Sequence, residues 1–258
     1  MSEFFTYKNI KAHYKSFGRG STIVLLHGFL ENLNMWDFLT PPLTRNRRII
    51  TIDLLGHGET ENLGYVHTME EQAELVRELL RSLNVRKATF IGHSMGGYIA
   101  LAFADLFPKN TKGICLLNST SYADTTAKKV SRDRAIKAVK ENHKTFINVS
   151  IPMLFSEENR TLLKGKIRLV TKEALSTSKQ GIIASLEGMK IRVDRTHILK
   201  NNAFKTLLIL GKKDTVLDIK THIKQIENTE TEFLEIDEGH MSHIEMTNNV
   251  VSALIKFC

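Results

Sequence analysis

A short glycine-flanked turn between a predicted strand and a predicted helix constrains this chain more than any other feature. The apolar run 88–91 predicts a buried strand, and residues 95–107 have the pattern of a helix that ends before Pro108. Between them stands GHSMGG, residues 92–97, which contains a G-x-S-x-G pattern. Its glycines permit a strained turn that lifts the Ser94 hydroxyl clear of a sheet. We therefore expect Ser94 to be a nucleophile.

Further predicted strands alternate with predicted helices along the chain. Residues 4–10 and 11–17 alternate apolar and polar side chains like the two strands of a hairpin. Continuous apolar runs typical of buried strands occur at 22–26, 48–52, 88–91, 113–117, 204–210 and 232–236. Helical spacing of apolar residues occurs at 68–83, 95–107, 218–227 and 242–257, and Thr68 with Glu71 resembles a capping box. This order predicts an α/β fold with a mostly parallel sheet and helices on both faces.

Residues 121–200 differ in character from the rest of the chain. They hold 17 Lys and Arg against 8 Asp and Glu, a net charge of +9, whereas all other residues sum to 19 against 20. This segment has helix-period sequence and no buried run, which predicts a helical cap, or lid, inserted into an α/β core formed by 1–120 and 201–258. The cations lack interleaved aromatic residues, so we expect a solvated helical face and no nucleic-acid partner. An anionic substrate is the alternative explanation.

Composition limits the remaining classes of protein. The chain has 258 residues, of which 42% are hydrophobic and 25% charged, as expected of one globular domain with an insertion. Cys115 and Cys258 cannot form a disulfide framework, and a structural zinc site is not expected. The first ten residues lack the apolar core of a signal peptide, and no stretch approaches eighteen apolar residues. We expect a cytoplasmic protein without membrane contact, either monomer or homodimer.

A nucleophilic serine requires a base, and the base requires an acid that orients it. Of the ten histidines, His240 follows the last predicted strand and therefore lies at the same sheet edge as Ser94. His243 is the alternative, although in the first turn of a helix we expect a surface or capping role for it. Asp214 follows the preceding predicted strand and is the expected acid, in the chain order Ser, Asp, His. Asp218 is its alternative, unless it caps the next helix.

Backbone amides are expected to stabilise an oxyanion. The turn directs the amide of Met95 toward the place where that charge would form. The second amide should come from the loop His27-Gly28-Phe29, where Gly28 allows close approach and Phe29 donates. We expect His27 itself to brace this loop by hydrogen bonds.

The glycine-rich segment 53–58 also follows a predicted strand. Asp53 and His57 are expected to hold loops together rather than to act on a substrate. A metal site formed by Asp53, His57 and His93 is an alternative, but it lacks a helix-spaced pair of ligands and a fourth ligand. We therefore expect no metal.

These residues resemble the α/β-hydrolase superfamily, in particular its serine esterase and lipase-like branch with a helical cap. The matching residues occur in the family's order: 27–29, 53–58, 92–97, Asp214, Gly239, His240 and Glu245. The resemblance implies an eight-stranded sheet, a cap after the sixth strand, a triad of Ser94, His240 and Asp214, and no cofactor. Dehalogenases and epoxide hydrolases of this superfamily carry an aspartate at the position of Ser94, so the serine disfavours both activities. The branch that makes a menaquinone precursor commonly has an arginine where Tyr98 stands here, which disfavours that activity.

The expected reaction is therefore hydrolysis of a carboxylic ester, thioester or lactone through an acyl-enzyme. Two alternatives use the same triad: cleavage of a carbon-carbon bond and hydrolysis of an enol-lactone. A third is a ligand receptor with slow turnover. The partner is expected to be a small acyl substrate, and the +9 cap makes a carboxylated one an alternative. Candidates for its pocket are the large apolar residues Leu30, Trp36, Tyr98, Phe146, Met153, Phe155 and Met189.

Overall fold

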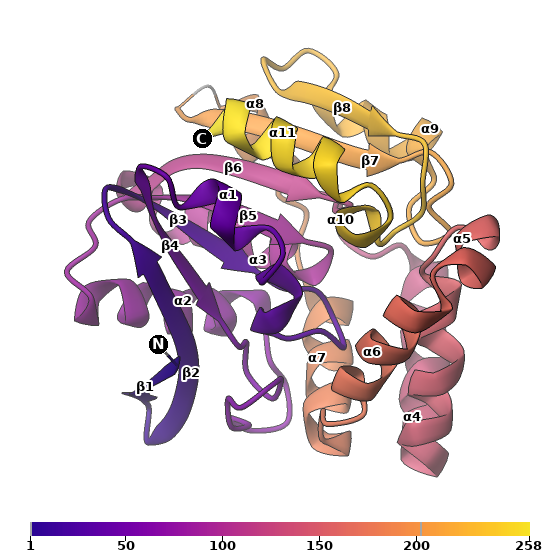
Figure 1. The fold of residues 1–258 in the computed structure, drawn as a ribbon. Coiled ribbons are helices and arrows are strands. Elements are labelled where there is room, and N and C mark those ends of the chain that lie inside the picture. The colour runs from indigo at the N-terminus through magenta and orange to yellow at the C-terminus, as the bar shows by residue number, and fades with distance from the viewer. Residues whose placement is uncertain (1, 202) are drawn as a thin grey trace.

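A computed structural model describes residues 2–201 and 203–258, which form one eight-stranded sheet with helices on both faces (Figure 1). The strands are β1 Ser2–Tyr7, β2 Ile10–Gly18, β3 Ser21–Leu26, β4 Arg47–Ile52, β5 Ala88–His93, β6 Thr111–Leu117, β7 Lys205–Gly211 and β8 Glu232–Ile236. Their order is β1-β2-β4-β3-β5-β6-β7-β8. β2 pairs antiparallel with β1 and β4, and all other pairs are parallel. The predicted α/β class is confirmed.

The parallel register brings the loops after the strands to one edge of the sheet. β3 lies between β4 and β5, so its apolar run is covered on both faces and only Ser21 is exposed. Leu26 pairs with Gly92, which places the loop after β3 beside the glycine turn after β5. Gly211 pairs with Ile236, which places the loops after β7 and β8 side by side.

Two groups of core helices cover the sheet. α2 Met69–Ser82 and α3 Met95–Leu106 pack together on one face, while α1 Thr40–Leu43 and α11 Thr247–Phe257 pack together on the other (Figure 1). The remaining short helices of the core are η1 Leu33–Trp36, η2 Pro108–Asn110, α9 Ile219–His222, η3 Ile223–Ile226 and α10 Ser242–Glu245. Each face of the sheet therefore has its own apolar core.

Three local expectations are corrected. The helix expected over 242–257 is interrupted at Met246, which has φ −132° and ψ 52° and separates α10 from α11. The helix expected over 218–227 consists of α9 and η3. At Thr68 only half of a capping box forms: its hydroxyl accepts from the amide of Glu71 at 3.0 Å, but the Glu71 carboxylate accepts instead from the hydroxyl of Tyr7 at 2.7 Å.

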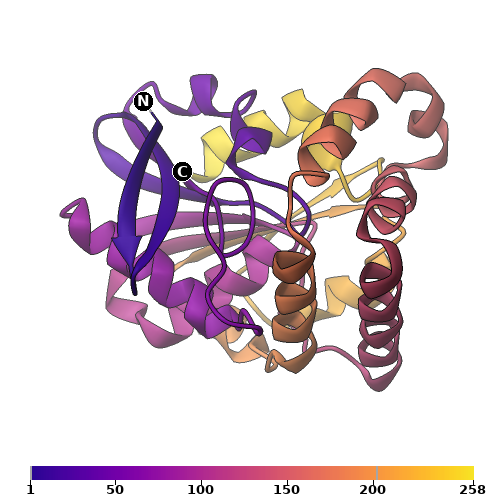
Figure 2. The same ribbon diagram turned by 90° about the horizontal axis from the view of Figure 1, so that it is seen from below.

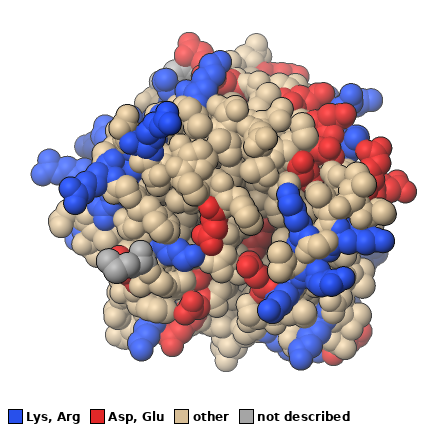
Figure 3. All heavy atoms as spheres, in the orientation of Figure 1, with Lys and Arg blue, Asp and Glu red and all other residues tan. Residues whose placement is uncertain are grey.

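Among the described residues between β6 and β7, where the cap was predicted, the structure has five helices. They are α4 Thr126–Met153, which is interrupted at Asn142, α5 Glu157–Leu162, α6 Lys164–Ala174, α7 Lys179–Ile191 and α8 Thr196–Lys200. Figure 2 shows α4 and α7 side by side at one end of the sheet. Figure 3 shows Lys and Arg side chains gathered at the lower right, where α4 and α6 lie in Figure 1. In the described part of the chain, no helix combines the length and apolar character needed to span a membrane.

Candidate active site

The turn between β5 and α3 holds Ser94 in a strained conformation. Ser94 has φ 47° and ψ −113°, a backbone conformation that residues other than glycine rarely adopt. Its carbonyl accepts a hydrogen bond from the Ser119 hydroxyl at 2.7 Å. A Cβ at Gly92 would collide with the backbone of Gly96, and a Cβ at Gly96 would collide with the carbonyl oxygen of Leu26. The two glycines thus allow the tight contact between turn, helix and β3 that the motif predicted.

The structure brings Ser94, His240 and Asp214 into one hydrogen-bonded row. Nε2 of His240 lies 2.9 Å from Oγ of Ser94, and Nδ1 lies 2.7 Å from Oδ2 of Asp214. Because a carboxylate only accepts, Nδ1 carries a proton and donates it, which leaves Nε2 to accept from the serine hydroxyl. The side chains of His240 and Asp214 are buried, whereas Ser94 is partly exposed. The serine is thus in reach of solvent while its two partners are not.

Asp214 is held as an anion. Burial by itself raises the pKa of this carboxyl, but the charge and hydrogen bond of His240 outweigh it and bring the pKa below its ordinary value. Two backbone amides act in the same direction, since Val216 and Leu217 donate to Oδ1 at 2.7 and 3.0 Å. An ionised Asp214 can therefore fix the orientation of the imidazole.

Asn118 is a site residue that the sequence did not reveal. It lies directly after β6 with φ 45°, and its Nδ2 donates to Oδ2 of Asp214 and to the carbonyl of Gly239, each at 3.2 Å. Its side-chain oxygen accepts from the hydroxyl of Ser242. The signal available in the sequence was its position at the carboxyl edge of the sheet, with a residue type that tolerates φ above zero.

The two alternative residues have other roles. Asp218 accepts from the amide of Thr221 at 2.9 Å and caps α9. This is the capping role that the sequence offered as the alternative to its being the acid. The surface role expected for His243 is wrong: α10 turns this ring inward, where 3% of the residue is exposed and its centroid lies 4.7 Å from that of His93. Burial lowers the pKa of His243 to about 3, so its imidazole is neutral.

The two expected oxyanion donors follow β3 and β5. Phe29 follows Gly28 in the loop after β3, and Met95 is the first residue of α3. Within residues 2–201 and 203–258, the structure gives neither amide a protein acceptor. His27 braces this loop as expected, since its Nε2 accepts from the amide of Leu54 at 2.9 Å and its Nδ1 donates to the Gly28 carbonyl at 2.7 Å. Both expected donors thus remain available to an oxyanion.

Asp53 and His57 connect loops, as expected. Asp53 accepts from the amides of Leu33 and Glu59 at 2.7 and 2.9 Å. Nε2 of His57 accepts from the amide of Leu30 at 3.4 Å, and burial lowers the pKa of His57 to about 3. These contacts use both side chains for loop structure.

A buried ion pair behind Ser94 was also not predicted. Nδ1 of His93 donates to Oε2 of Glu31 at 2.7 Å, and Nε2 donates to the backbone carbonyl of His240 at 3.0 Å. The same Oε2 accepts from the amide of Gly28 at 2.6 Å. Burial by itself lowers the pKa of His93, but the charge and hydrogen bond of Glu31, together with the His240 carbonyl and the charge of Asp214, outweigh it and raise that pKa. The pKa of Glu31 falls to about 2, because His93 outweighs the effect of burial. Because a carboxylate and a backbone carbonyl only accept, both ring nitrogens of His93 donate, and the ring is therefore protonated.

The expected pocket residues occupy different surroundings. Trp36 is fully buried in the core beneath α1 and α11, Met153 is half exposed, and Leu30 lines a cavity of about 480 Å³. The others are buried in, or packed against, the larger core: Tyr98, Phe146, Phe155 and Met189. Their role toward a substrate stays a prediction.

Comparisons with known proteins identify the fold family. A family model described as alpha/beta hydrolase fold matches residues 21–247. A thermophilic esterase from Thermogutta terrifontis superposes with a TM-score of 0.92 and 27% sequence identity, covering 99% of this chain and 97% of that one. The match therefore extends over nearly the whole of both chains.

Two curated relatives carry other descriptions. A dihydrolipoyllysine-residue acetyltransferase component of the acetoin cleaving system from Pseudomonas putida is 28% identical over 92% of this chain. A putative 2-succinyl-6-hydroxy-2,4-cyclohexadiene-1-carboxylate synthase from Bacillus subtilis is 31% identical over 65% of this chain. In both cases the match spans 63% of the relative's length.

Proposed function

We propose that this chain, which belongs to the α/β-hydrolase fold family, is a serine hydrolase that cleaves an ester, thioester or lactone through an acyl-enzyme. The observation that carries the proposal is the row of contacts from Ser94 through His240 to Asp214, with distances of 2.9 and 2.7 Å. Nucleophile, base and orienting acid are thereby within hydrogen-bond reach of one another. The likeness to an esterase supports the same reaction class.

The first half-reaction forms the acyl-enzyme. Oγ of Ser94 attacks the carbonyl carbon while Nε2 of His240 takes the hydroxyl proton, and Asp214 stabilises the resulting imidazolium. The amides of Phe29 and Met95 donate hydrogen bonds to the tetrahedral oxyanion, each contributing about 3 kcal/mol. When the carbon–oxygen or carbon–sulfur bond breaks, the imidazolium returns its proton to the leaving group. Water then attacks the acyl-enzyme by the same route and releases the acid.

Burst kinetics with p-nitrophenyl esters of increasing acyl length test this proposal. Wild-type protein should release one equivalent of p-nitrophenol rapidly and then turn over steadily, and the length series should report the size of the acyl pocket. Ser94→Ala should show neither phase while melting at the wild-type temperature. Equal turnover by the folded variant would exclude Ser94 as the nucleophile. A folded wild-type protein with no burst and no turnover would favour the carbon-carbon hydrolase or the receptor.

We further propose that the substrate carries a carboxylate. Asp124 contacts Arg132 and Arg192, while the neighbouring Lys128 lies close enough for burial and the two arginines to lower its pKa. Three cations thus surround one carboxylate. The Arg192 guanidinium lies 4.0 Å from the ring centroid of Tyr98, four residues beyond Ser94. Arg192 of the cap thereby lies next to Tyr98, and Tyr98 stands at the position where the branch that makes a menaquinone precursor commonly has an arginine.

Salt dependence separates an anionic from a neutral preference. We expect kcat/KM for 4-nitrophenyl hydrogen succinate to fall steeply with added NaCl, and that for 4-nitrophenyl butyrate to change little. Lys128→Gln should lower the succinate-to-butyrate ratio of kcat/KM. Parallel salt curves for the two esters would contradict the anionic preference and leave the hydrolase proposal intact.

A further inference from the structure

Three side chains able to bind a metal converge behind the site described above. Glu31 comes from the loop after β3, His93 from the end of β5 and His243 from α10. Their ligand atoms all lie within 4.8 Å of one another, and all three residues are buried. Two imidazoles and one carboxylate form a donor set that suits zinc and neighbouring transition metals better than magnesium or calcium.

Part of this cluster has no hydrogen-bond partner. Among the described residues, Oε1 of Glu31 and both ring nitrogens of His243 are buried without one. The Glu31–His93 ion pair uses only the other carboxylate oxygen, Oε2. Leaving a buried polar atom unpaired costs about 1 to 3 kcal/mol, so an occupant that binds several such atoms would be stabilised at this place.

The unpartnered atoms already have a spacing suited to a metal. Oε1 of Glu31 and Nε2 of His243 lie 3.7 Å apart. Two ligands of one tetrahedral zinc, each bound at about 2.1 Å, are roughly 3.4 Å apart. A shift of a few tenths of an ångström would therefore let both atoms bind one ion. His93 would complete the set by turning Nδ1 from Glu31 to the ion.

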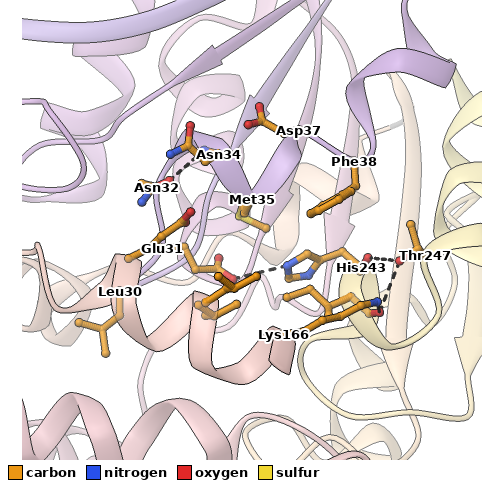
Figure 4. A pocket seen from close by; sticks show the side chains of 14 residues that line it. Leu30, Glu31, Asn32, Asn34, Met35, Asp37, Phe38, Lys166, His243 and Thr247 are labelled. Atoms are coloured by element: carbon orange, nitrogen blue, oxygen red, sulfur yellow. Dashed lines mark hydrogen bonds and ion pairs between the residues drawn. The ribbon is translucent and has the colours of Figure 1, made fainter. Parts of the chain in front are cut away.

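The cavity of about 480 Å³ gives this cluster a route to solvent. Glu31 and His243 both line it, and Figure 4 shows their side chains directed toward each other, with Phe38 above and Lys166 below His243 in that view. Asp37 and Glu173 also line the cavity and add negative charge to its wall, and Lys166 adds one positive charge. An ion could enter this way, and its open coordination position would face the cavity.

We propose that Glu31, His93 and His243 form a binding site for a divalent transition-metal ion such as Zn²⁺. The ion accepts electron pairs from Nδ1 of His93, Nε2 of His243 and the Glu31 carboxylate, and the proton that Nδ1 now donates to Glu31 leaves to solvent. Nε2 of His93 keeps its own proton and its hydrogen bond to the His240 carbonyl at 3.0 Å. Such outer hydrogen bonds orient metal-bound imidazoles. Water or a ligand from the cavity takes the fourth position.

Calorimetric titration of untagged, chelator-treated protein with Zn²⁺ tests the site. We expect one ion per chain and, with Co²⁺ instead, the intense visible absorption of a tetrahedral site. His243→Phe keeps an aromatic ring against Trp36 and removes two unpartnered nitrogens, so it should fold and lose affinity by more than about 100-fold, beyond the cost of losing an outer partner. His197→Gln, which removes an exposed histidine, should bind like wild type.

Two results would overturn the site. One is equal Zn²⁺ affinity in wild type and His243→Phe, which would mean adventitious surface binding. The other is wild-type protein that takes up no Zn²⁺ and gives only the weak absorption of hydrated Co²⁺. If His243→Phe does not fold, the Co²⁺ spectrum of wild type decides. Ser94→Ala should bind Zn²⁺ like wild type, so the outcome does not depend on the proposed hydrolase activity.

Discussion

Nε2 of His93 donates a hydrogen bond to the backbone carbonyl of His240, 3.0 Å away, although 147 positions separate the two residues in the chain. The other nitrogen of that ring contacts Glu31, whose carboxylate also accepts the amide of Gly28. The loop that carries the base and the loop that carries an expected oxyanion donor are thus connected through one buried ion pair. We infer that Glu31 is a positioning residue for both.

Glu31→Gln tests this connection. The neutral amide weakens the contacts to Gly28 and His93, so we expect kcat for an activated ester to fall by about tenfold to 100-fold, because small displacements of reacting groups cost this much. KM should change little, since Glu31 is not proposed to touch the substrate. The pair of constants is measured alongside the melting temperature. Unchanged kcat in a folded variant, or an effect on KM alone, would contradict the positioning role.

Asp214→Asn tests the acid of the proposed triad. Asparagine can donate to Nδ1 of His240, which favours the tautomer with the proton on Nε2, where it cannot accept from Ser94. We expect kcat to fall by about 10⁴-fold with little change in KM. Asp218→Asn is the matched control, since Asp218 caps α9 and faces solvent. A similar loss of kcat in the two variants would contradict the assignment of Asp214, rather than Asp218, as the acid of the triad.

The parts of the site that were predictable depend on local sequence and chain order. The backbone geometry at Ser94 is predictable from local sequence, because the flanking glycines, the buried strand and the helix all lie within about ten residues of it. Asp214 and His240 follow from the rule that loops after parallel strands meet at one sheet edge. The same rule left Asp218 as the alternative to Asp214, unless it caps the next helix. The structure places Asp214 beside His240 and uses Asp218 as the cap of α9.

The parts that were missed depend on which way side chains turn. Glu31 contacts His93 across 62 positions, and Asn118 contacts Asp214 across 96. Chain order places such residues at the sheet edge but does not determine which of their side chains meet. His243 was assigned to the surface because a first helical turn is usually exposed. The break at Met246 makes α10 a separate short turn whose inward face is buried, so the ordinary expectation fails there.

Two glycines of the cap helices offer a matched pair of substitutions. A Cβ on Gly188 in α7 would overlap the backbone carbonyl of His67, whereas a Cβ on Gly165 in α6 would meet nothing within 4 Å. Gly188→Ala should therefore lower the free energy of unfolding by about 1 to 3 kcal/mol through overpacking. Gly165→Ala should raise it by about 0.5 to 1 kcal/mol through helix propensity. Urea unfolding measures both. An unchanged free energy of unfolding in Gly188→Ala would show that α7 is not closely packed on the core.

Asp124 links two cap elements through buried charge. It pairs with Arg192 at 2.6 Å and with Arg132. Burial by itself raises the pKa of Asp124, but the two arginines outweigh it and bring that pKa below its ordinary value of about 4. Asp124→Asn leaves Arg192 buried beside a neutral partner, so we expect a loss of about 3 to 5 kcal/mol in unfolding free energy at pH 7.

The pH dependence of this loss identifies its electrostatic origin. A carboxyl whose pKa is lower in the folded than in the unfolded state stabilises fully above the unfolded pKa and loses that stabilisation as pH falls through the folded pKa. The gap in unfolding free energy between wild type and Asp124→Asn should therefore stay constant from about pH 6 to 8 and shrink below about pH 4. Urea midpoints across this range measure the gap. A gap that persists undiminished to pH 3 would mean that shape and hydrogen bonding, rather than the charge of Asp124, hold the two arginines.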